Sequence, residues 1–432
     1  MIRSLTASSI PSNVPEDSQD VLIVGGGVIG LCCGWYLSKA GYKVTILDRD
    51  PTRKSACSDE NAGMVVPSHF IPLAAPGVIS QGLKWMLNPK SPFYMRPRLD
   101  PALWSWCWKF FRHANVRHVE NSKHILSTIS LESRRLFLEL ADELNFNLET
   151  CGLMMLCQTE AGLEEEAEVA SMAAEVGVQA EVCNAGRVRE LDPEVRMDVV
   201  GGVWFEQDCH LDPLEFMEEL RRGIREREGT FLDDEAKDFI RQGDRLTAVE
   251  TAKGERLKAD WFVLAGGAWT PEMMRQLGLR LPMQGGKGYS LTLKNPTELP
   301  RLCSLLKEAR VAVTPMGEKL RVGGTMEICG TDLSVSHKRV QGIIESFCRF
   351  FPAFKESDFD GIEPWSGLRP CTPDGLPCIG PIPGTQNATV ATGHAMLGLS
   401  LGPVTGQLVT QMVSQTPLEL DIDLSRLSPD RF

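Results

Sequence analysis

The feature that most constrains the fold is a glycine-rich turn between two short apolar runs near the start of the chain. A run of strand length at 21–24 leads into the glycines of 25–30, and an apolar helical pattern then continues as far as Gly41. A second strand-length run at 44–47 is closed by Asp48. This order of strand, Gly-x-Gly-x-x-Gly turn, helix, strand and acid predicts a βαβ unit that binds a dinucleotide.

Each part of this unit has a physical role in binding. We expect Gly25 to make the tight turn, Gly27 to let the backbone approach a pyrophosphate, and Gly30 to let helix and strand pack closely. The helix N-terminus offers free N–H groups and a positive dipole end to phosphates, and Asp48 can accept hydrogen bonds from ribose hydroxyls. The residues of this unit placed at the cofactor are Gly25, Gly27, Val28, Ile29, Gly30, Asp48 and Arg49.

The rest of the chain favours FAD over a nicotinamide dinucleotide. No regular strand–helix units follow Asp48 directly, because the chain enters a segment containing Pro, Gly and Ser at 58–76. Later apolar strands at 261–264 and 389–392 each run into small residues. Such strands, spread over the whole chain, suit a long cofactor lying along the carboxyl edge of one sheet. After the first of them, the cofactor residues are Ala265, Gly266 and Trp269.

Composition and charge narrow the classes of function. The 432 residues are 43% hydrophobic and 24% charged, which is ordinary globular usage. Forty-five Lys and Arg against 57 Asp and Glu give a net charge of −12, which disfavours nucleic-acid binding. The 13 scattered cysteines include no CxxC pair, and Cys209-His210 has no further ligands at metal-binding spacing. We therefore expect reduced thiols and no metal site.

The sequence shows neither a secretory signal nor an uninterrupted apolar stretch of membrane-spanning length. We expect a cytoplasmic protein with a flexible tail at 1–19, and peripheral contact with the inner membrane is the alternative. The Trp-rich segment at 103–112 is apolar nearly all round, which favours a buried core helix. The alternative for this segment is a membrane-surface or quinone-docking patch shared with residues 84–86.

A set of short motifs follows in a fixed order along the chain after residue 20. The motifs are Asn61-Ala62-Gly63, Ala74-Ala75-Pro76-Gly77-Val78, Lys287-Gly288-Tyr289-Ser290-Leu291, Arg321-Val322-Gly323-Gly324, Gly367-Leu368-Arg369-Pro370, Thr372-Pro373-Asp374-Gly375 with Gly380, and Thr392-Gly393-His394 with Leu397-Gly398. In order and spacing they resemble the amine-oxidising FAD family that contains D-amino-acid oxidase, glycine oxidase and sarcosine oxidase. Within it, the likeness is closest to the small subunits of bacterial D-amino-acid dehydrogenases.

The resemblance implies an α/β fold with a Rossmann-like FAD-binding domain and an interleaved substrate domain built on an antiparallel or mixed sheet. The FAD-binding domain is expected at 20–80, 187–281 and 363–432, and the substrate-binding domain at 81–186 and 282–362. FAD is expected to bind without a covalent bond. The further cofactor-binding residues implied are Asn61, Ala62, Gly63, Met64, Gly398, Leu399 and Ser400. A helix over 404–413 is expected to aim its N-terminus at the flavin.

The activity implied is oxidative deamination of D-amino acids, or of related imino acids, to 2-oxo acids. A hydride passes from Cα to flavin N5, and the electrons go on to a quinone or another acceptor. The alternatives are a glycine- or sarcosine-type oxidase that uses oxygen, a D-hydroxyproline-type imino acid dehydrogenase, and a flavin electron-transfer subunit without its own substrate. The partners implied are therefore a small amino acid and an electron acceptor.

Four residues are the candidates for catalysis. Arg369 can bind the substrate carboxylate through two parallel hydrogen bonds, and a structural salt bridge is its alternative role. Tyr289 can bind the carboxylate or wall the pocket, and otherwise packs across strands. Lys287 can raise the positive potential near the flavin, against the alternative of an exposed lysine at a strand end. His394 is expected to pack beside the flavin in preference to acting as a base.

Overall fold

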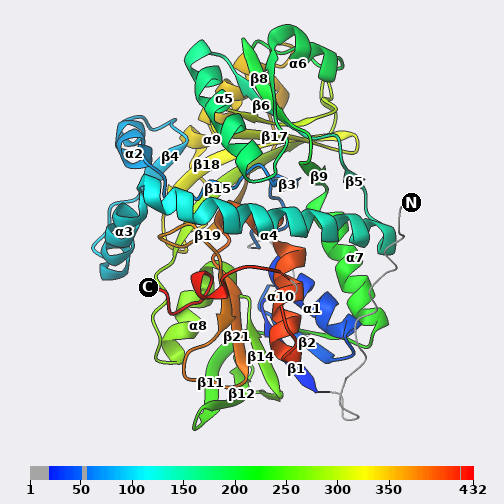
Figure 1. Ribbon diagram of the computed structural model, residues 1–432, viewed down its shortest axis with the longest axis vertical. Coiled ribbons are helices and arrows are strands. Elements are labelled where there is room, and N and C mark those ends of the chain that lie inside the picture. The colour runs from blue at the N-terminus through cyan, green and yellow to red at the C-terminus, as the bar shows by residue number, and fades with distance from the viewer. Residues whose placement is uncertain (1–18, 51–55, 419) are drawn as a thin grey trace.

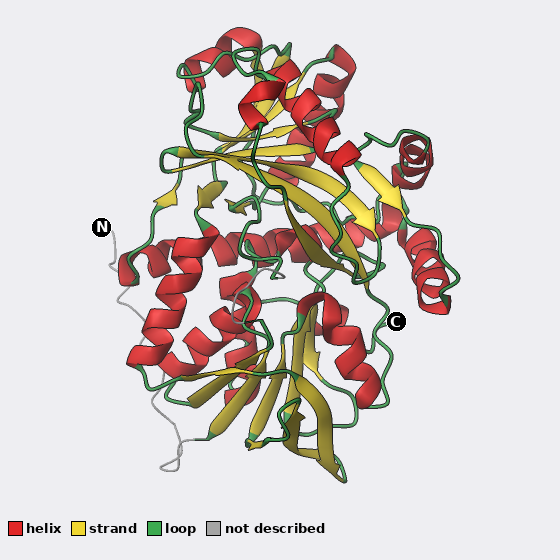
Figure 2. Cartoon of the chain, turned by 180° about the vertical axis from the view of Figure 1, so that it is seen from behind, coloured by secondary structure: helices red, strands yellow, loops and turns green. Residues whose placement is uncertain are grey.

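The computed structural model describes residues 19–50, 56–418 and 420–432, so nearly all of the predicted tail at 1–19 lies outside the described residues. Two sheets lie one above the other, and the long helix α4 (Val116–Glu143) crosses between them (Figures 1 and 2). All 13 cysteines are free thiols in the structure.

The lower sheet in Figure 1 contains the predicted βαβ unit. Its strands, in spatial order, are β10 (Thr230–Asp233), β2 (Lys43–Asp48), β1 (Asp20–Val24), β14 (Trp261–Leu264), β21 (Ala388–Thr392) and β20 (Cys378–Pro381). The first five run parallel, and β20 pairs antiparallel with β21. The sequence predictions of β1, β2, β14 and β21 are confirmed, and the Rossmann-like sheet is therefore present.

Three helices cover this sheet. They are α1 (Val28–Lys39), α7 (Pro213–Glu226) and α10 (Gly402–Ser414), and α1 packs against both of the others. The predicted helices of the βαβ unit and of residues 404–413 are confirmed. Because β1, β14 and β21 are parallel, their carboxyl ends meet at one edge, where ligands of such sheets bind.

The upper sheet is mixed, as predicted for the second sheet. Its strands, in spatial order, are β19 (Trp365–Cys371), β15 (Gln284–Leu293), β18 (Lys319–Ile328), β17 (Val311–Met316), β16 (Cys303–Leu306), β6 (Leu153–Cys157), β8 (Gly201–Phe205) and β7 (Glu181–Asn184), with β4 (Phe93–Met95) beside β18. Helices α5 (Glu160–Glu175), α6 (Ala185–Leu191) and α9 (His337–Phe350) pack on it. Tyr289 and Val322 share a buried cluster with Phe347 of α9.

The remaining elements connect or flank the two sheets. They are the strands β11 (Ala236–Gln242), β12 (Arg245–Thr251), β13 (Arg256–Lys258), β3 (Met64–Val65), β9 (Cys209–Leu211) and β5 (Leu148–Glu149), the helices α2 (Val78–Met86), α3 (Pro101–His113) and α8 (Thr270–Gln276), and short 3-10 helices at 267–269, 356–359, 395–397 and 424–426. Among the described residues, no helix is long and apolar enough to cross a membrane.

The division into domains stays a prediction. Strands β8 and β19 belong to the nine-stranded sheet, although residues 187–281 and 363–432 are predicted to bind FAD. The chain therefore changes sheet within those two segments, after each of these strands.

The prediction that the Trp-rich segment is a core helix is wrong for one face of α3. Leu103 and Trp106 are buried, as predicted, but Trp104, Trp108 and Phe111 are each 60–63% exposed. A helix that is apolar all round gives no sequence signal that distinguishes its buried face from its exposed one. The outward face is therefore an unusual apolar surface.

Candidate active site

One large cavity joins the carboxyl edge of the six-stranded sheet to the underside of the nine-stranded sheet. Its volume is about 1910 Å³, and its lining runs from the glycine-rich turn after β1 to Arg369 on β19. Most of the predicted cofactor residues line it, namely Gly25, Gly27, Val28, Ile29, Asp48, Arg49, Asn61, Ala62, Met64, Ala265, Gly266, Trp269, Gly398 and Leu399. The predicted residues that do not line it are Gly30, Gly63 and Ser400.

The three glycines of the turn meet different surroundings. A Cβ added to Gly25 would lie 2.4 Å from the carbonyl oxygen of Ala265, and one added to Gly30 would lie 1.8 Å from that of Gly25. These two glycines therefore permit close backbone packing. A Cβ on Gly27 would meet only the Ser58 hydroxyl at 3.4 Å, so the space before the N-terminus of α1 is open to a ligand.

The Asp48 carboxylate holds the turn and also faces the cavity. Its Oδ2 accepts a hydrogen bond from the Gly26 N–H at 2.5 Å, and its Oδ1 accepts one from the Asp50 N–H at 2.8 Å. Each oxygen retains a second lone pair that can accept a ribose hydroxyl. The Arg49 guanidinium lies 4.1 Å from the centre of a Trp269 ring at the same end of the cavity.

A short loop before β3 closes the turn from the other side. The Ser58 hydroxyl accepts a hydrogen bond from the Val28 N–H at 3.1 Å, which satisfies a free donor at the start of α1. Asn61 folds its own loop, because its Oδ1 accepts from the Gly63 N–H at 2.7 Å and its Nδ2 donates to the Ser58 carbonyl. Ser400 does not line the cavity, but its hydroxyl accepts a hydrogen bond from the N–H of Val66, which does.

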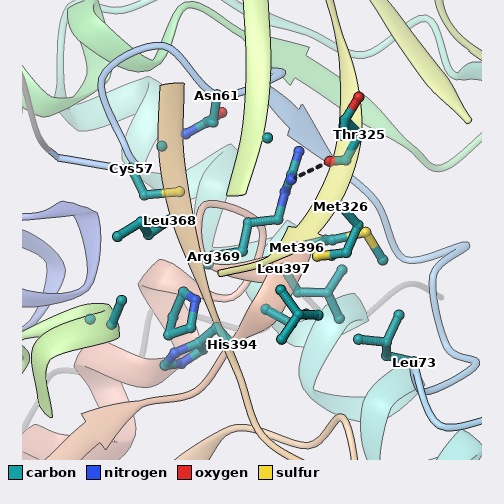
Figure 3. A pocket seen from close by; sticks show the side chains of 18 of the residues that line it. Cys57, Asn61, Leu73, Thr325, Met326, Leu368, Arg369, His394, Met396 and Leu397 are labelled. Atoms are coloured by element: carbon teal, nitrogen blue, oxygen red, sulfur yellow. Dashed lines mark hydrogen bonds between the residues drawn. The ribbon is translucent and has the colours of Figure 1, made fainter. Parts of the chain in front are cut away.

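Arg369 lies at the other end of the cavity without an acidic partner. Its Nη1 donates to the carbonyl of Thr325 at 2.8 Å, and Figure 3 shows Met326 and Leu397 beside it. Within the described residues, no carboxylate forms an ion pair with this guanidinium. A Cβ on Gly288 would lie 2.2 Å from Nη1, so the arginine depends on a glycine at that position.

Thr325 owes its contact with Arg369 to a β-bulge. The pairing of β15 with β18 shifts between Lys287 and Tyr289, and β18 contributes one residue more than β15 there. Thr325 has φ +72°, which is an unusual conformation for a β-branched residue. Bulges commonly re-aim groups beside active sites. Our sequence predictions missed Thr325, although the quoted motif Gly323-Gly324 ends just before it.

Tyr289 is among the residues that line the cavity, but the Tyr289 and Lys287 side chains bond to groups on β18 and in the segment before α9, and neither is bonded to Arg369. The Tyr289 hydroxyl donates to Glu327 Oε2 at 2.9 Å, and burial of the phenol raises its pKa. Lys287 Nζ donates to the Ser334 carbonyl at 2.6 Å and lies 3.4 Å from an oxygen of Asp332. Lys287 is 1% exposed, so its alternative as an exposed strand-end residue is wrong.

His394 lines the cavity and is buried and neutral. Thr405 uses its hydroxyl hydrogen on the Leu401 carbonyl, so His394 Nε2, 3.0 Å away, must be the donor to Thr405 Oγ1. Nδ1 then carries a lone pair, and it has no hydrogen-bond partner among the described residues. Burial lowers the pKa of this histidine to about 3, so the ring is uncharged near neutral pH.

A second histidine also lines the cavity and was not among the predicted site residues. His69 Nδ1 lies 3.1 Å from the Ser68 hydroxyl, which donates to Asp208 Oδ2 at 2.5 Å. Burial lowers the pKa of His69 to about 4 and raises that of Asp208 to about 7. These three side chains form a continuous polar line from the cavity wall into the protein.

This two-sheet arrangement, with a phosphate-binding turn and an arginine sharing one cavity, places the chain among the dinucleotide-dependent oxidoreductases. A model of the "FAD dependent oxidoreductase" family matches residues 20–412, and the chain belongs to that family. It is therefore an FAD-dependent enzyme, which confirms the predicted cofactor.

Two relatives illustrate the sequence similarity. A D-amino acid dehydrogenase of Granulibacter bethesdensis is 33% identical over 402 residues, which cover 91% of this chain and 95% of that protein. A D-amino acid dehydrogenase of Bradyrhizobium diazoefficiens is 33% identical over 430 residues, covering 95% of this chain and 98% of that protein.

Solved structures show the same fold at lower identity. Glycine oxidase from Geobacillus kaustophilus superposes with a TM-score of 0.74 at 23% identity and covers 96% of this chain and 100% of its own. Iminodiacetate oxidase from Chelativorans sp. gives a TM-score of 0.72 at 21% identity, with coverage of 95% and 98%. The predicted fold class is confirmed.

The residues present fit FAD. The open space at Gly27 and the N–H groups at the start of α1 suit a pyrophosphate, and the remaining lone pairs of Asp48 suit ribose hydroxyls. At the far end, Gly398 and Leu399 line the cavity just before α10, and the unpartnered Nδ1 of His394 lies in the same wall.

Proposed function

We propose that this enzyme oxidises the Cα–N bond of D-amino acids and passes the electrons to an acceptor other than oxygen. The observation that carries the proposal is the Arg369 guanidinium, which lines the cavity and has no acidic partner among the described residues. A cation left without a carboxylate in a partly buried site is suited to receive one from a ligand. The relatives at 33% identity, named D-amino acid dehydrogenases, support this substrate class.

Arg369 binds and orients the substrate. Its planar fork donates two parallel hydrogen bonds to the carboxylate, while the Thr325 carbonyl holds Nη1 in place. Fixing the carboxylate fixes the direction of the Cα–H bond, which is the main contribution a protein makes to a reaction of this type. Met326, Leu368 and Leu397 line the surrounding wall and exclude water.

The chemistry divides between cofactor and protein. Bound FAD supplies the two-electron acceptor that takes a hydride from Cα. The substrate binds with its amine neutral, the ammonium proton having gone to bulk solvent before binding. Loss of hydride from Cα then leaves an imino acid, which water hydrolyses to a 2-oxo acid and ammonia. Burial lowers the pKa of His394 to about 3, so its Nδ1 lone pair is a weak base, and we assign the residue to the cavity wall beside the flavin and not to proton abstraction.

The N-terminus of α10 contributes electrostatically. Gly398 and Leu399 line the cavity, and α10 begins at Gly402 with Pro403 in its first turn. The partial positive charge at a helix N-terminus stabilises negative charge that develops on a nearby group. We propose that this helix end, and not the distant Lys287, stabilises the reduced cofactor.

We also propose that the two sheets bind different molecules. The six-stranded sheet with α1, α7 and α10 binds FAD through its carboxyl edge, and the nine-stranded sheet covers the substrate. The placement of the Gly27 turn on the first and of Arg369 and Thr325 on the second supports this division.

The experiment that tests the proposal measures product and acceptor together. FAD-loaded enzyme is incubated with D-alanine and an artificial dye, and the 2-oxo acid and ammonia are quantified against dye reduction and oxygen uptake. We expect dye reduction to exceed oxygen uptake by at least about tenfold, with one 2-oxo acid for each two-electron reduction. Equal rates with air and dye would make the enzyme an oxidase, and no 2-oxo acid with any amino acid would refute the proposed substrate class.

A further inference from the structure

The exposed apolar side chains of this protein are concentrated in one lobe. Among the described residues, 11 large apolar side chains are exposed, and seven of them lie between residues 83 and 116. Those seven are Leu83, Leu87, Leu99, Trp104, Trp108, Phe111 and Val116. They belong to α2, to α3 and to the segments beside them, which project from one side of the molecule (Figure 1). We call residues 78–117 the α2–α3 lobe.

Helix α3 has two apolar faces, and only one of them is covered. Leu103 and Trp106 pack inward, where the Trp106 indole N–H donates to the Cys371 carbonyl at 2.9 Å. Trp104, Trp108 and Phe111 are spaced four and three residues apart, which places them on a single outward face. Core packing alone would not require this second apolar face.

The charge of the lobe is opposite to that of the rest of the chain. The α2–α3 lobe, residues 78–117, contains seven Lys and Arg residues but only one acidic residue, whereas the whole protein has a net charge of −12. Lys90, Arg96 and Arg98 form ion pairs. The lobe has four more cations, Lys84, Lys109, Arg112 and Arg117. None of these four forms an ion pair with a residue in the described part of the chain.

We propose that the outward face of the α2–α3 lobe docks on the surface of a bilayer that contains anionic phospholipids. Trp and Phe side chains enter the interface between headgroups and acyl chains, while the unpaired Lys and Arg attract the lipid phosphates. The excess negative charge elsewhere repels the same surface, so electrostatics orient the protein with this lobe toward the lipid.

The same lobe surrounds part of the cavity. Leu83, Leu99, Trp104 and Phe111 line the cavity as well as being exposed. Docking would therefore place this mouth of the cavity at the lipid surface, where an apolar acceptor dissolved in the bilayer could enter. A two-fold contact between two copies is disfavoured, because it would bring two basic lobes together.

The test uses the full FAD-loaded chain and sedimentation with vesicles. The probes are phosphatidylcholine vesicles and vesicles of phosphatidylcholine with one quarter phosphatidylglycerol. We expect binding to the anionic vesicles to be at least about tenfold tighter, and to weaken as salt is raised. The Lys84→Glu/Arg112→Glu variant should lose this preference for anionic lipid.

The apolar contribution is tested with a matched pair of variants. Trp104→Ser/Trp108→Ser/Phe111→Ser should reduce vesicle binding at least about tenfold, whereas Leu138→Ser/Val182→Ser, which also replaces exposed apolar side chains, should leave it unchanged. Lipids brominated in their acyl chains should quench tryptophan fluorescence of the wild type and not of the triple variant. These measurements do not depend on turnover, so they stand whether or not the proposed substrate is correct.

Three results would overturn the proposal. They are equal binding to neutral and anionic vesicles, unchanged binding by a triple variant that keeps its bound FAD and melting temperature, and absence of vesicle binding by the wild type. A wild type that sediments as a dimer, with a monomeric triple variant, would instead assign the face to a second copy of the chain.

Discussion

Replacement of Gly288 by alanine should disable Arg369 without touching the arginine itself. The added Cβ would lie 2.2 Å from Nη1, 2.5 Å from Nη2 and 2.6 Å from Cζ of Arg369, where ordinary contact begins near 3.4 Å. Gly288 is not among the glycines with positive φ, so alanine fits the backbone. The guanidinium, as the end of a flexible side chain, must therefore move by about 1 Å or more.

The cost of this displacement follows from the bonds that it breaks. Nη1 loses its 2.8 Å hydrogen bond to the Thr325 carbonyl, and the fork no longer meets both carboxylate oxygens of the substrate. Hydrogen bonds to a charged group contribute about 1.5–3 kcal/mol each, and partial compensation leaves a loss of about 2–4 kcal/mol. We expect kcat/KM to fall roughly 30- to 1000-fold, while the free energy of unfolding changes by less than about 1 kcal/mol.

The assay is anaerobic reduction of the bound flavin in a double-mutant cycle with Arg369→Leu. In the Arg369→Leu background, Gly288→Ala should have almost no further effect, because the group it displaces is absent. Arg369→Leu alone should cost about 3–5 kcal/mol, or roughly 10²–10⁴ in kcat/KM, and Arg369→Lys should recover only part of it. If Gly288→Ala were equally damaging in both backgrounds, its effect would not act through Arg369 and our assignment of the arginine would fail.

Three further predictions concern the cofactor turn, the buried carboxyl group and the buried lysine. Gly27→Val should fold with a near-normal melting temperature, because a Cβ at this position meets only the Ser58 hydroxyl, at 3.4 Å. The variant should nevertheless bind little FAD, because the new side chain enters the space expected to hold the pyrophosphate. Stoichiometric FAD in the purified variant would contradict this prediction. Because burial raises the pKa of Asp208 to about 7, the folded protein binds that proton more tightly than the unfolded chain, so this group's stabilisation is lost as pH rises from about 4 to 7. Urea unfolding of Asp208→Asn should therefore show a shallower fall in stability over that range, and parallel pH profiles would refute it. Lys287→Met should lower the melting temperature, because Asp332 loses its ion pair with Lys287 and the Ser334 carbonyl loses its donor. The redox potential of the bound flavin should stay unchanged. A shifted potential would place Lys287 near the flavin.

The parts of the fold that were predicted correctly depend on local sequence signals. The βαβ unit at 20–48 combines strand-length apolar runs with glycines whose packing roles are visible in the contacts of Gly25 and Gly30. The strands predicted at 261–264 and 389–392 were recognised by the same combination of an apolar run and small residues, and the structure has them at 261–264 and 388–392. Such signals lie within a few residues of one another, so no knowledge of tertiary structure is needed to read them.

The details that the sequence did not predict depend on which face of an element is covered. In strand β15, only tertiary packing decides that the Tyr289 and Lys287 side chains bond to groups other than Arg369, while Gly288 faces the guanidinium. The carbonyl of Thr325 reaches Arg369 through a bulge between two strands that are distant in the sequence, and no local pattern marks it. The outward face of α3 was missed for the same reason, since nothing in its sequence distinguishes the two apolar faces.

The most direct test of the proposed activity is anaerobic mixing of the yellow FAD-loaded enzyme with D-alanine and, separately, with L-alanine, followed by flavin absorbance. The account predicts that D-alanine bleaches the flavin completely and yields one pyruvate per flavin, that L-alanine does so far more slowly, and that Arg369→Leu is bleached by neither. A flavin that is reduced by glycine or sarcosine but not by any D-amino acid, or that Arg369→Leu reduces at the wild-type rate, would contradict it.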